Sequence, residues 1–188
     1  MRALIVYESM YGNTHVIADG IRGGFPSDDE VKVVPVRDAT AGLVDWADLL
    51  IVGGPTHVHS LSRESTRKGA RDAAAKTGSR LTMDPSADGP GLREWFNGLG
   101  PLHGKDAAAF DTRLDAPAIF TGRASKGIVH RLEHSGANPI APAESFVVNR
   151  DNQLVSGESE RAVHWGQTLA RMPVGVAGRV AEAVPSGR

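Results

Sequence analysis

Short apolar segments recur along this chain at intervals that suit the strands of a sheet. Each segment is rich in valine, isoleucine, leucine, alanine or phenylalanine, and polar residues, glycine or proline lie around it. Runs of this length and composition, separated by longer segments, are typical of buried strands. We therefore expect strands at Ala3–Tyr7, Val31–Val36, Leu49–Val52, Asp106–Phe110 and Ser145–Val148.

The segments between these runs have the periodicity of amphipathic helices. In the first of them Ile17 and Ile21 are four residues apart, so they share the face that would meet a sheet. Helices that alternate with strands in this way predict an α/β fold, with a parallel sheet covered on both faces. We expect helices at Thr14–Arg22, Ser62–Ala75, Ala124–His134 and Glu158–Met172, with a weak helical turn at Ala41–Trp46.

Two stretches do not follow this alternation. Residues 76–90 mix glycine, serine, aspartate and proline, which predicts a surface loop or insertion before a short apolar helix at Leu92–Leu99. Beyond Pro173 the tail has no amphipathic face, and disorder and an extension along the sheet edge are both compatible with it. We expect one domain at residues 1–172 and a tail at 173–188.

Composition narrows the classes of function. With 188 residues, of which 40% are hydrophobic, the chain can bury one continuous core, and a net charge of -1 gives no electrostatic case for binding nucleic acid. It contains no cysteine, which excludes disulfides, thiolate catalysis and iron–sulfur ligation. Redox chemistry would therefore need a bound cofactor. No apolar run approaches a membrane span or a signal sequence, so we expect a cytoplasmic protein.

The first strand is followed at once by a segment of hydroxyl, amide and glycine residues, Ser9-Met10-Tyr11-Gly12-Asn13-Thr14. The first amides of a helix lack intrahelical acceptors, so a phosphate there gains several hydrogen bonds and the positive end of the helix dipole. The segment has no lysine or arginine, which favours a single phosphate over a triphosphate with magnesium. An N-cap without any ligand would also explain its hydroxyl residues.

Two further segments complete a pattern that resembles the flavodoxin family from Met1 to Met172. Gly53–His59 resembles the Gly-x-Pro-Thr loop of that family, and Phe110–Leu114 stands where another flavin-contacting loop belongs. The resemblance implies a flavodoxin-like three-layer sandwich, with a five-stranded parallel sheet of order 2-1-3-4-5, and it implies FMN as a non-covalent cofactor. Three such loops at the carboxyl ends of strands agree with the rule for ligand sites in open α/β sheets.

The resemblance also implies which residues hold the cofactor. Ser9 to Thr14 would surround the phosphate, Pro55 to Val58 one face and edge of the ring, and Asp111 to Arg113 the opposite edge. We interpret His57 and His59 as loop residues beside the flavin, because their spacing lacks the further ligands of a metal site. The candidate cofactor-binding residues are Ser9, Met10, Tyr11, Gly12, Asn13, Thr14, Pro55, Thr56, His57, Val58, Asp111, Thr112 and Arg113.

This chain departs from the family pattern in two ways. Family members often stack an aromatic residue on the flavin from the third loop, but Asp111-Thr112-Arg113 has none, which leaves Arg113 or Met10 as substitutes. Flavodoxins that act as low-potential carriers tend to be strongly acidic, whereas this chain is almost neutral. The departures concern the redox partner and the reduction potential more than the cofactor.

Three arginines, Arg63, Arg67 and Arg71, are spaced four residues apart on the helix after the second loop. Such residues project from a common side of a helix. They predict either a solvated face, balanced by Glu64 and Asp72, or a docking surface for an acidic redox partner or a phosphorylated nicotinamide donor.

The function that follows is an FMN-binding carrier that shuttles electrons between a reductase and a downstream acceptor, with no catalytic side chain and no metal. One alternative is an FMN-dependent enzyme of the NAD(P)H:quinone reductase type. Another is an interaction module that keeps the fold without FMN.

Overall fold

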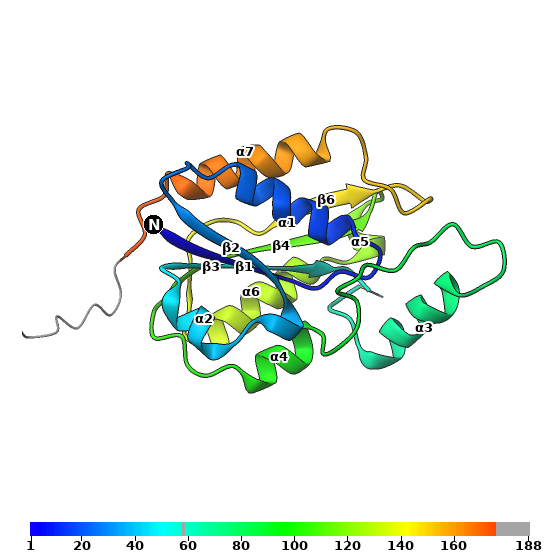
Figure 1. Ribbon diagram of the computed structural model, residues 1–188, viewed down its shortest axis with the longest axis horizontal. Helices are drawn as coiled ribbons and strands as arrows, with labels where there is room; N and C mark the ends of the chain where they lie inside the picture. Colours follow the sequence, from blue (N-terminus) through cyan, green and yellow to red (C-terminus); the bar gives the residue numbers. More distant parts are fainter. Residues whose placement is uncertain (58, 176–188) are drawn as a thin grey trace, which may run out of the picture.

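The computed structural model describes residues 1–57 and 59–175, which form a parallel sheet between two layers of helices (Figure 1). The strands run in the order β2-β1-β3-β4-β5, and β6 also pairs with β4. Their bounds are β1 (Arg2–Tyr7), β2 (Glu30–Pro35), β3 (Leu49–Pro55), β4 (Asp106–Leu114), β5 (Asn138–Pro139) and β6 (Glu144–Val148). The predicted α/β class and strand order are confirmed.

One face of the sheet is covered by α1 (Asn13–Gly23) and α7 (Glu158–Ala170), and the other by α2 (Ala41–Trp46), α4 (Leu92–Gly98) and α6 (Ala124–His134). Figure 1 shows α3 (Glu64–Ala74) beyond the end of the sheet, at the side of the molecule. Two short helical segments, η1 (Val36–Asp38) and α5 (Ala118–Thr121), lie in the connections.

The central strands are apolar on both sides because both faces of the sheet are buried. On β3, Leu49 and Ile51 pack toward α1 and α7, while Leu50 and Val52 pack toward the layer of α2, α4 and α6. Where α1 meets α7, a Cβ atom on Gly166 would collide with the backbone of Ile21, so only glycine permits this close contact.

Several element ends differ from the sequence prediction. The third and fourth strands continue to Pro55 and Leu114 instead of ending at Val52 and Phe110, because their extensions pair with each other and with β6. The expected fifth strand is β6, and the two-residue β5 was not predicted. Among the described residues the sheet therefore has six strands, with β5 beside the start of β4 and β6 beside its end.

The segment 76–90 is a loop, as predicted, but it is tied to the start of α1. The amide of Asp84 donates to the carbonyl of Met10 at 2.8 Å, and His15 Nδ1 lies 3.3 Å from Asp84 Oδ2. The insertion thus supports the segment before α1 from outside.

At the other end of the described chain, the amide of Gly175 donates to Asp106 Oδ2 at 2.6 Å, and Val174 packs against the core. The prediction for the rest of the tail, 176–188, lies outside the described residues. None of the helices in the described part is long and apolar enough to cross a membrane.

Candidate functional site

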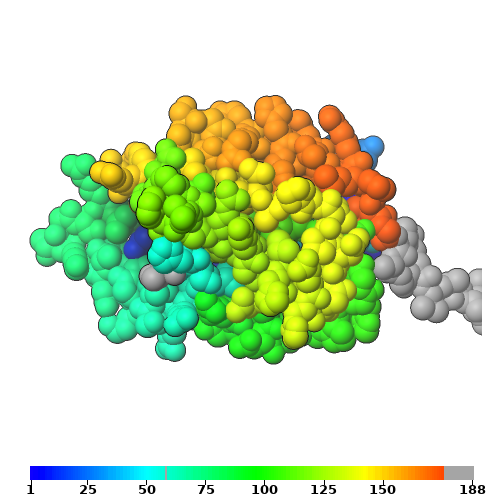
Figure 2. All heavy atoms as spheres, turned by 180° about the vertical axis from the view of Figure 1, so that it is seen from behind, coloured from blue at the N-terminus to red at the C-terminus, as the bar shows by residue number. Residues whose placement is uncertain are grey.

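A cavity of about 250 Å³ opens at the carboxyl ends of β1, β3, β4 and β6. Figure 2 shows it as a hollow whose floor contains the dark-blue atoms of the N-terminal segment. The cavity lies at the edge of the sheet where open α/β folds bind ligands. Its lining residues are Ser9, Met10, Tyr11, Asn13, Thr14, Pro55, Thr56, His57, Thr112, Arg113, Leu114, Val148, Asn149, Arg150 and Asn152.

Gly12 gives the first loop its shape without lining the cavity. It precedes α1 with φ of 93°, a left-handed conformation that residues with a Cβ atom adopt only with strain. Its carbonyl accepts the amide of Val16 at 3.0 Å, and its own amide donates to Ser9 Oγ at 3.1 Å. The glycine therefore turns the chain into the helix and aims the first amides of α1 at the cavity.

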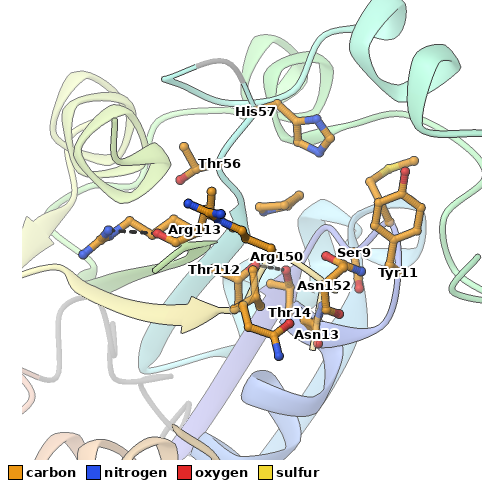
Figure 3. A pocket seen from close by; sticks show the side chains of 15 residues that line it. Ser9, Tyr11, Asn13, Thr14, Thr56, His57, Thr112, Arg113, Arg150 and Asn152 are labelled. Atoms are coloured by element: carbon orange, nitrogen blue, oxygen red, sulfur yellow. Dashed lines mark hydrogen bonds between the residues drawn. The ribbon is translucent and has the colours of Figure 1, made fainter. Parts of the chain in front are cut away.

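Side chains of this loop are held by residues from distant segments (Figure 3). The hydroxyls of Thr14 and Thr112 lie 2.7 Å apart and are buried, and Asn13 Nδ2 donates to the carbonyl of Asn152 at 2.9 Å. These contacts join the start of α1 to β4 and to the segment after β6. The free amides at the start of α1 consequently have a fixed position, which suits an anion.

The second loop is also fixed by hydrogen bonds. The amide of Thr56 donates to the carbonyl of Thr112 at 2.8 Å, and Thr56 Oγ1 accepts the first amide of α6, from Ala124, at 2.9 Å. His57 and Ser60 exchange two backbone hydrogen bonds, of 2.8 and 3.0 Å. Val58, which the sequence also assigned to this loop, lies outside the described residues.

In the view of Figure 3, the imidazole of His57 lies across the cavity from Ser9, Asn13 and Thr14. Burial of this ring, with a smaller contribution from the charge of Arg67, lowers the pKa of His57 below its ordinary value. The imidazole is therefore neutral at pH 7.

The third predicted segment contributes less than expected. Asp111 has 0% exposure, and its carboxylate accepts the amide of Ser125 at the start of α6 at 2.7 Å. Burial raises the pKa of Asp111 above its ordinary value. The prediction that Asp111 meets a ligand is wrong for its side chain, because it points into the protein to hold α6.

Thr112 and Arg113 do line the cavity, although Arg113 is restrained. Its Nη1 donates to the carbonyls of Ala116 at 2.7 Å and Leu114 at 3.2 Å. These bonds hold the guanidinium against the segment after β4.

The position of the third loop also needs correction. Because β4 continues to Leu114, the connection to α6 begins at Asp115 and includes α5. This connection contains an aromatic residue, Phe120, which is 73% exposed and does not line the cavity. Asp111-Thr112-Arg113 has no aromatic residue, as stated, but the sequence prediction placed the third loop too early in the chain.

Sequence reasoning missed a fourth wall of the cavity, which comes from the end of β4, from β6 and from the segment after β6. The same rule of strand ends that located the first loops would have located it, because polar residues follow β6 directly. Arg150 brings a cation that the first loop lacks. Leu114 belongs to the predicted segment Phe110–Leu114 without being a named candidate, and the missed lining residues are Val148, Asn149, Arg150 and Asn152.

The predicted arginine stripe on α3 is wrong at its centre. Arg67 is only 5% exposed, donates to Ser62 Oγ at 3.1 Å and forms an ion pair with Glu94 at 3.2 Å. The helix turns this residue toward α4, so Arg67 cannot share an exposed docking face with Arg63 and Arg71.

The arrangement of strands and helices is similar to that of solved flavodoxins. Oxidised flavodoxin 1 from Bacillus cereus has a TM-score of 0.60 and 18% identity, over 92% of this chain and 100% of that chain. A flavodoxin from Streptococcus pneumonia TIGR4 has a TM-score of 0.60 and 18% identity, over 90% of this chain and 98% of that chain.

A flavodoxin, WrbA-like protein from Agrobacterium tumefaciens, has a TM-score of 0.54 and 18% identity, over 90% of this chain and 94% of that chain. Comparison of the sequence itself finds no family model and no curated protein that matches. The similarity therefore lies in the three-dimensional structure, and this chain has the flavodoxin-like fold.

Proposed function

We propose that this chain binds FMN in the cavity and carries electrons between a donor protein and an acceptor. The observation that carries the proposal is the composition of the cavity wall. It contains Arg113 and Arg150, neutral donors from Ser9 to Thr14, and no carboxylate side chain among its described lining residues. Such a wall suits a phosphate ester, and the solved structures with this fold include several flavodoxins.

The phosphate would lie against the start of α1. Gly12 permits the turn, and the amides of Asn13 and Thr14 precede the first intrahelical hydrogen bonds. The positive end of the helix dipole adds to their attraction for an anion. Since the hydroxyl of Thr14 is already bonded to Thr112, we assign the phosphate mainly to backbone amides, with Arg150 as a nearby cation.

The flavin ring would lie against the less polar part of the wall. Leu114 and Val148 line the cavity with apolar side chains, and the hydroxyl of Tyr11 donates to the carbonyl of Ala70 at 3.0 Å, which fixes its ring. Bound FMN supplies reversible one- and two-electron chemistry, while the protein holds it and controls access to it. No side chain has to form a bond with a substrate.

The second candidate is an NAD(P)H:quinone reductase type of enzyme. The neutral His57 in the cavity wall favours it, because an imidazole there is able to exchange a proton with a quinone as it is reduced. The carrier function remains the better supported one, since it requires only a cofactor and an open cavity mouth.

The first experiment is to release any cofactor from freshly purified protein and identify it by mass spectrometry, together with the visible absorption spectrum. Fluorescence titrations of the cofactor-free chain with FMN and with riboflavin then measure the contribution of the phosphate. FMN should bind at least tenfold more tightly, since charge-assisted hydrogen bonds contribute about 1.5–3 kcal/mol each. Equal affinities would refute the phosphate assignment, and no binding of either ligand would favour an FMN-free module.

A separate assay distinguishes carrier from enzyme. NAD(P)H and a quinone are added to the FMN-loaded chain without a reductase. A carrier should leave NAD(P)H unoxidised, whereas steady oxidation with saturation by the quinone would establish the second candidate.

A further inference from the structure

A second hollow, of about 460 Å³, lies beside the cavity between α5, the start of α6 and the second loop. Its lining includes His59, Ser60, Ile119, Arg123 and Lys126, and among the described lining residues there is no carboxylate. We call it the α5 groove. In Figure 2 the green atoms of residues around 120 adjoin the cyan atoms of the second loop at this place.

Four cations surround the α5 groove. Arg123 and Lys126 are exposed on its wall, Arg93 Nη2 donates to Ser60 Oγ at 3.2 Å, and Arg131 Nη1 donates to the carbonyl of Gly127 at 3.2 Å. Burial first, and then the charges of Arg131 and Arg63, lower the pKa of Arg93. Arg131 and Arg63 are thus close enough to Arg93 to repel it, and with Arg123 and Lys126 on the groove wall this face attracts negative charge.

The same face exposes apolar side chains. Ile119 and Phe120 on α5 are 82% and 73% exposed, the largest values among the large hydrophobic residues described. Exposed apolar residues flanked by charged ones mark protein interaction sites, whose centre is apolar and whose rim is polar. A dinucleotide would instead need a pocket that encloses it, whereas both of these side chains are largely exposed to solvent.

The α5 groove and the cavity share the second loop in their walls. His59 and Gly122 form a bridge between the second loop and the connection after β4. Gly122 has φ of 73°, and a Cβ atom there would collide with the backbone of His59. Residues 55–57 line the cavity and residues 59 and 60 line the groove, so a protein seated on the groove would lie beside the cavity mouth.

From these observations we propose that the α5 groove docks an acidic redox protein, with Ile119 and Phe120 in the centre of the contact and Arg123 and Lys126 on its rim. That the docked protein exchanges electrons with this chain rests on the proposed carrier function. It replaces the stripe on α3, whose central arginine is buried. Complementary charge would speed association, and the apolar pair would slow dissociation.

The test uses the full chain and a plant-type [2Fe–2S] ferredoxin, which is an acidic electron carrier. Chemical shifts of the isotope-labelled chain are followed as ferredoxin is added, and they should change mainly at residues 118–127 and 59–60. The variant R123E/K126E should bind about tenfold more weakly at low salt and lose most of its salt dependence. Shift changes confined to another face, or no binding, would overturn the proposal.

Matched controls separate specific docking from net charge and from folding. R22E/R171E reverses two exposed arginines on α1 and at the end of α7, and should stay within twofold of the unmodified chain. I119S should weaken binding about threefold, whereas V16S, at an exposed valine of α1, should not. The proposal would be overturned if R22E/R171E weakened binding as much as R123E/K126E, or if V16S weakened it as much as I119S.

Flavin content is measured in the same samples, because ferredoxin binding by chemical shift does not require flavin. Failure of the unmodified chain to bind FMN, with docking intact, would refute the cofactor proposal and leave the docking face supported. If F120S weakens FMN affinity and leaves ferredoxin binding unchanged, Phe120 belongs to the cavity and its place in the docking face is overturned. Stronger shifts at the groove with NADPH than with ferredoxin would overturn the choice of a protein partner.

Discussion

Thr14 at the start of α1 and Thr112 near the end of β4 are 98 positions apart in the sequence, and their hydroxyl oxygens lie 2.7 Å apart in the interior. Either hydroxyl can be the donor, and both residues line the cavity. The pair fixes the start of α1 relative to the end of β4. It also removes these hydroxyls from the set of groups that are free to meet a ligand.

The first prediction concerns this pair. T14V leaves the hydroxyl of Thr112 buried without its partner, so the free energy of unfolding should fall by about 1–3 kcal/mol. T14V/T112V should recover part of this loss because neither polar group then remains unpaired. Urea unfolding of the single and double variants measures the coupling. T168V, which removes an exposed hydroxyl on α7, is the control and should change stability little. Additive losses would mean that the pair is not coupled.

The second prediction concerns Gly12. G12A places a Cβ atom at φ of 93°, so the free energy of unfolding should fall by about 1–2 kcal/mol and FMN affinity should fall with it. The matched control is G69A, because Gly69 lies inside α3 with open space around its Cβ position. That change should stabilise the helix by about 0.5–1 kcal/mol and leave FMN affinity unchanged. Stability is measured by thermal unfolding and FMN affinity by flavin titration. If G12A behaved like G69A in both, the role assigned to Gly12 would be contradicted.

The third prediction concerns Arg150. R150Q keeps a polar side chain but removes the charge, so FMN affinity should fall about threefold to tenfold while riboflavin affinity changes little. The difference between the ligands matters because only FMN has a phosphate. R22Q, on an exposed part of α1, controls for net charge. A parallel loss for riboflavin would place Arg150 beside the ring instead.

These residues also show what the sequence predicts and what it does not. The segment from Ser9 to Thr14 was located because its signal is local: an apolar strand, a glycine turn and a helix within a few residues. The end of β4 was misplaced because Arg113 and Leu114 join the strand by pairing with Val147 and Val148 on β6. Nothing in the local pattern specifies that pairing.

The local sequence pattern also does not predict which charged side chains are buried. The spacing of Arg63, Arg67 and Arg71 correctly indicates a helix, but the burial of Arg67 depends on Ser62 and on Glu94 from another helix. Helical spacing gives the direction of a side chain around its own axis and not the element that it meets. The sequence prediction fails for Asp111 for a similar reason, because its role as a hydrogen-bond acceptor depends on where α6 begins.

The last prediction uses the pKa of His57, which burial of the ring, and secondarily the charge of Arg67, lowers below its value in the unfolded chain. Between these two pKa values the unfolded chain binds more protons than the folded one, so the stability of the folded state rises with pH. Stability linked to His57 is therefore fully present above the ordinary histidine pKa of about 6.5 and is lost as pH falls through it toward the lower folded value. H57Q should remove this part of the pH dependence in urea unfolding. Nuclear magnetic resonance of the ring protons should give a His57 pKa in the folded chain below the ordinary histidine value of about 6.5. A His57 pKa equal to or above that ordinary value would contradict the neutral imidazole on which the quinone reductase candidate depends.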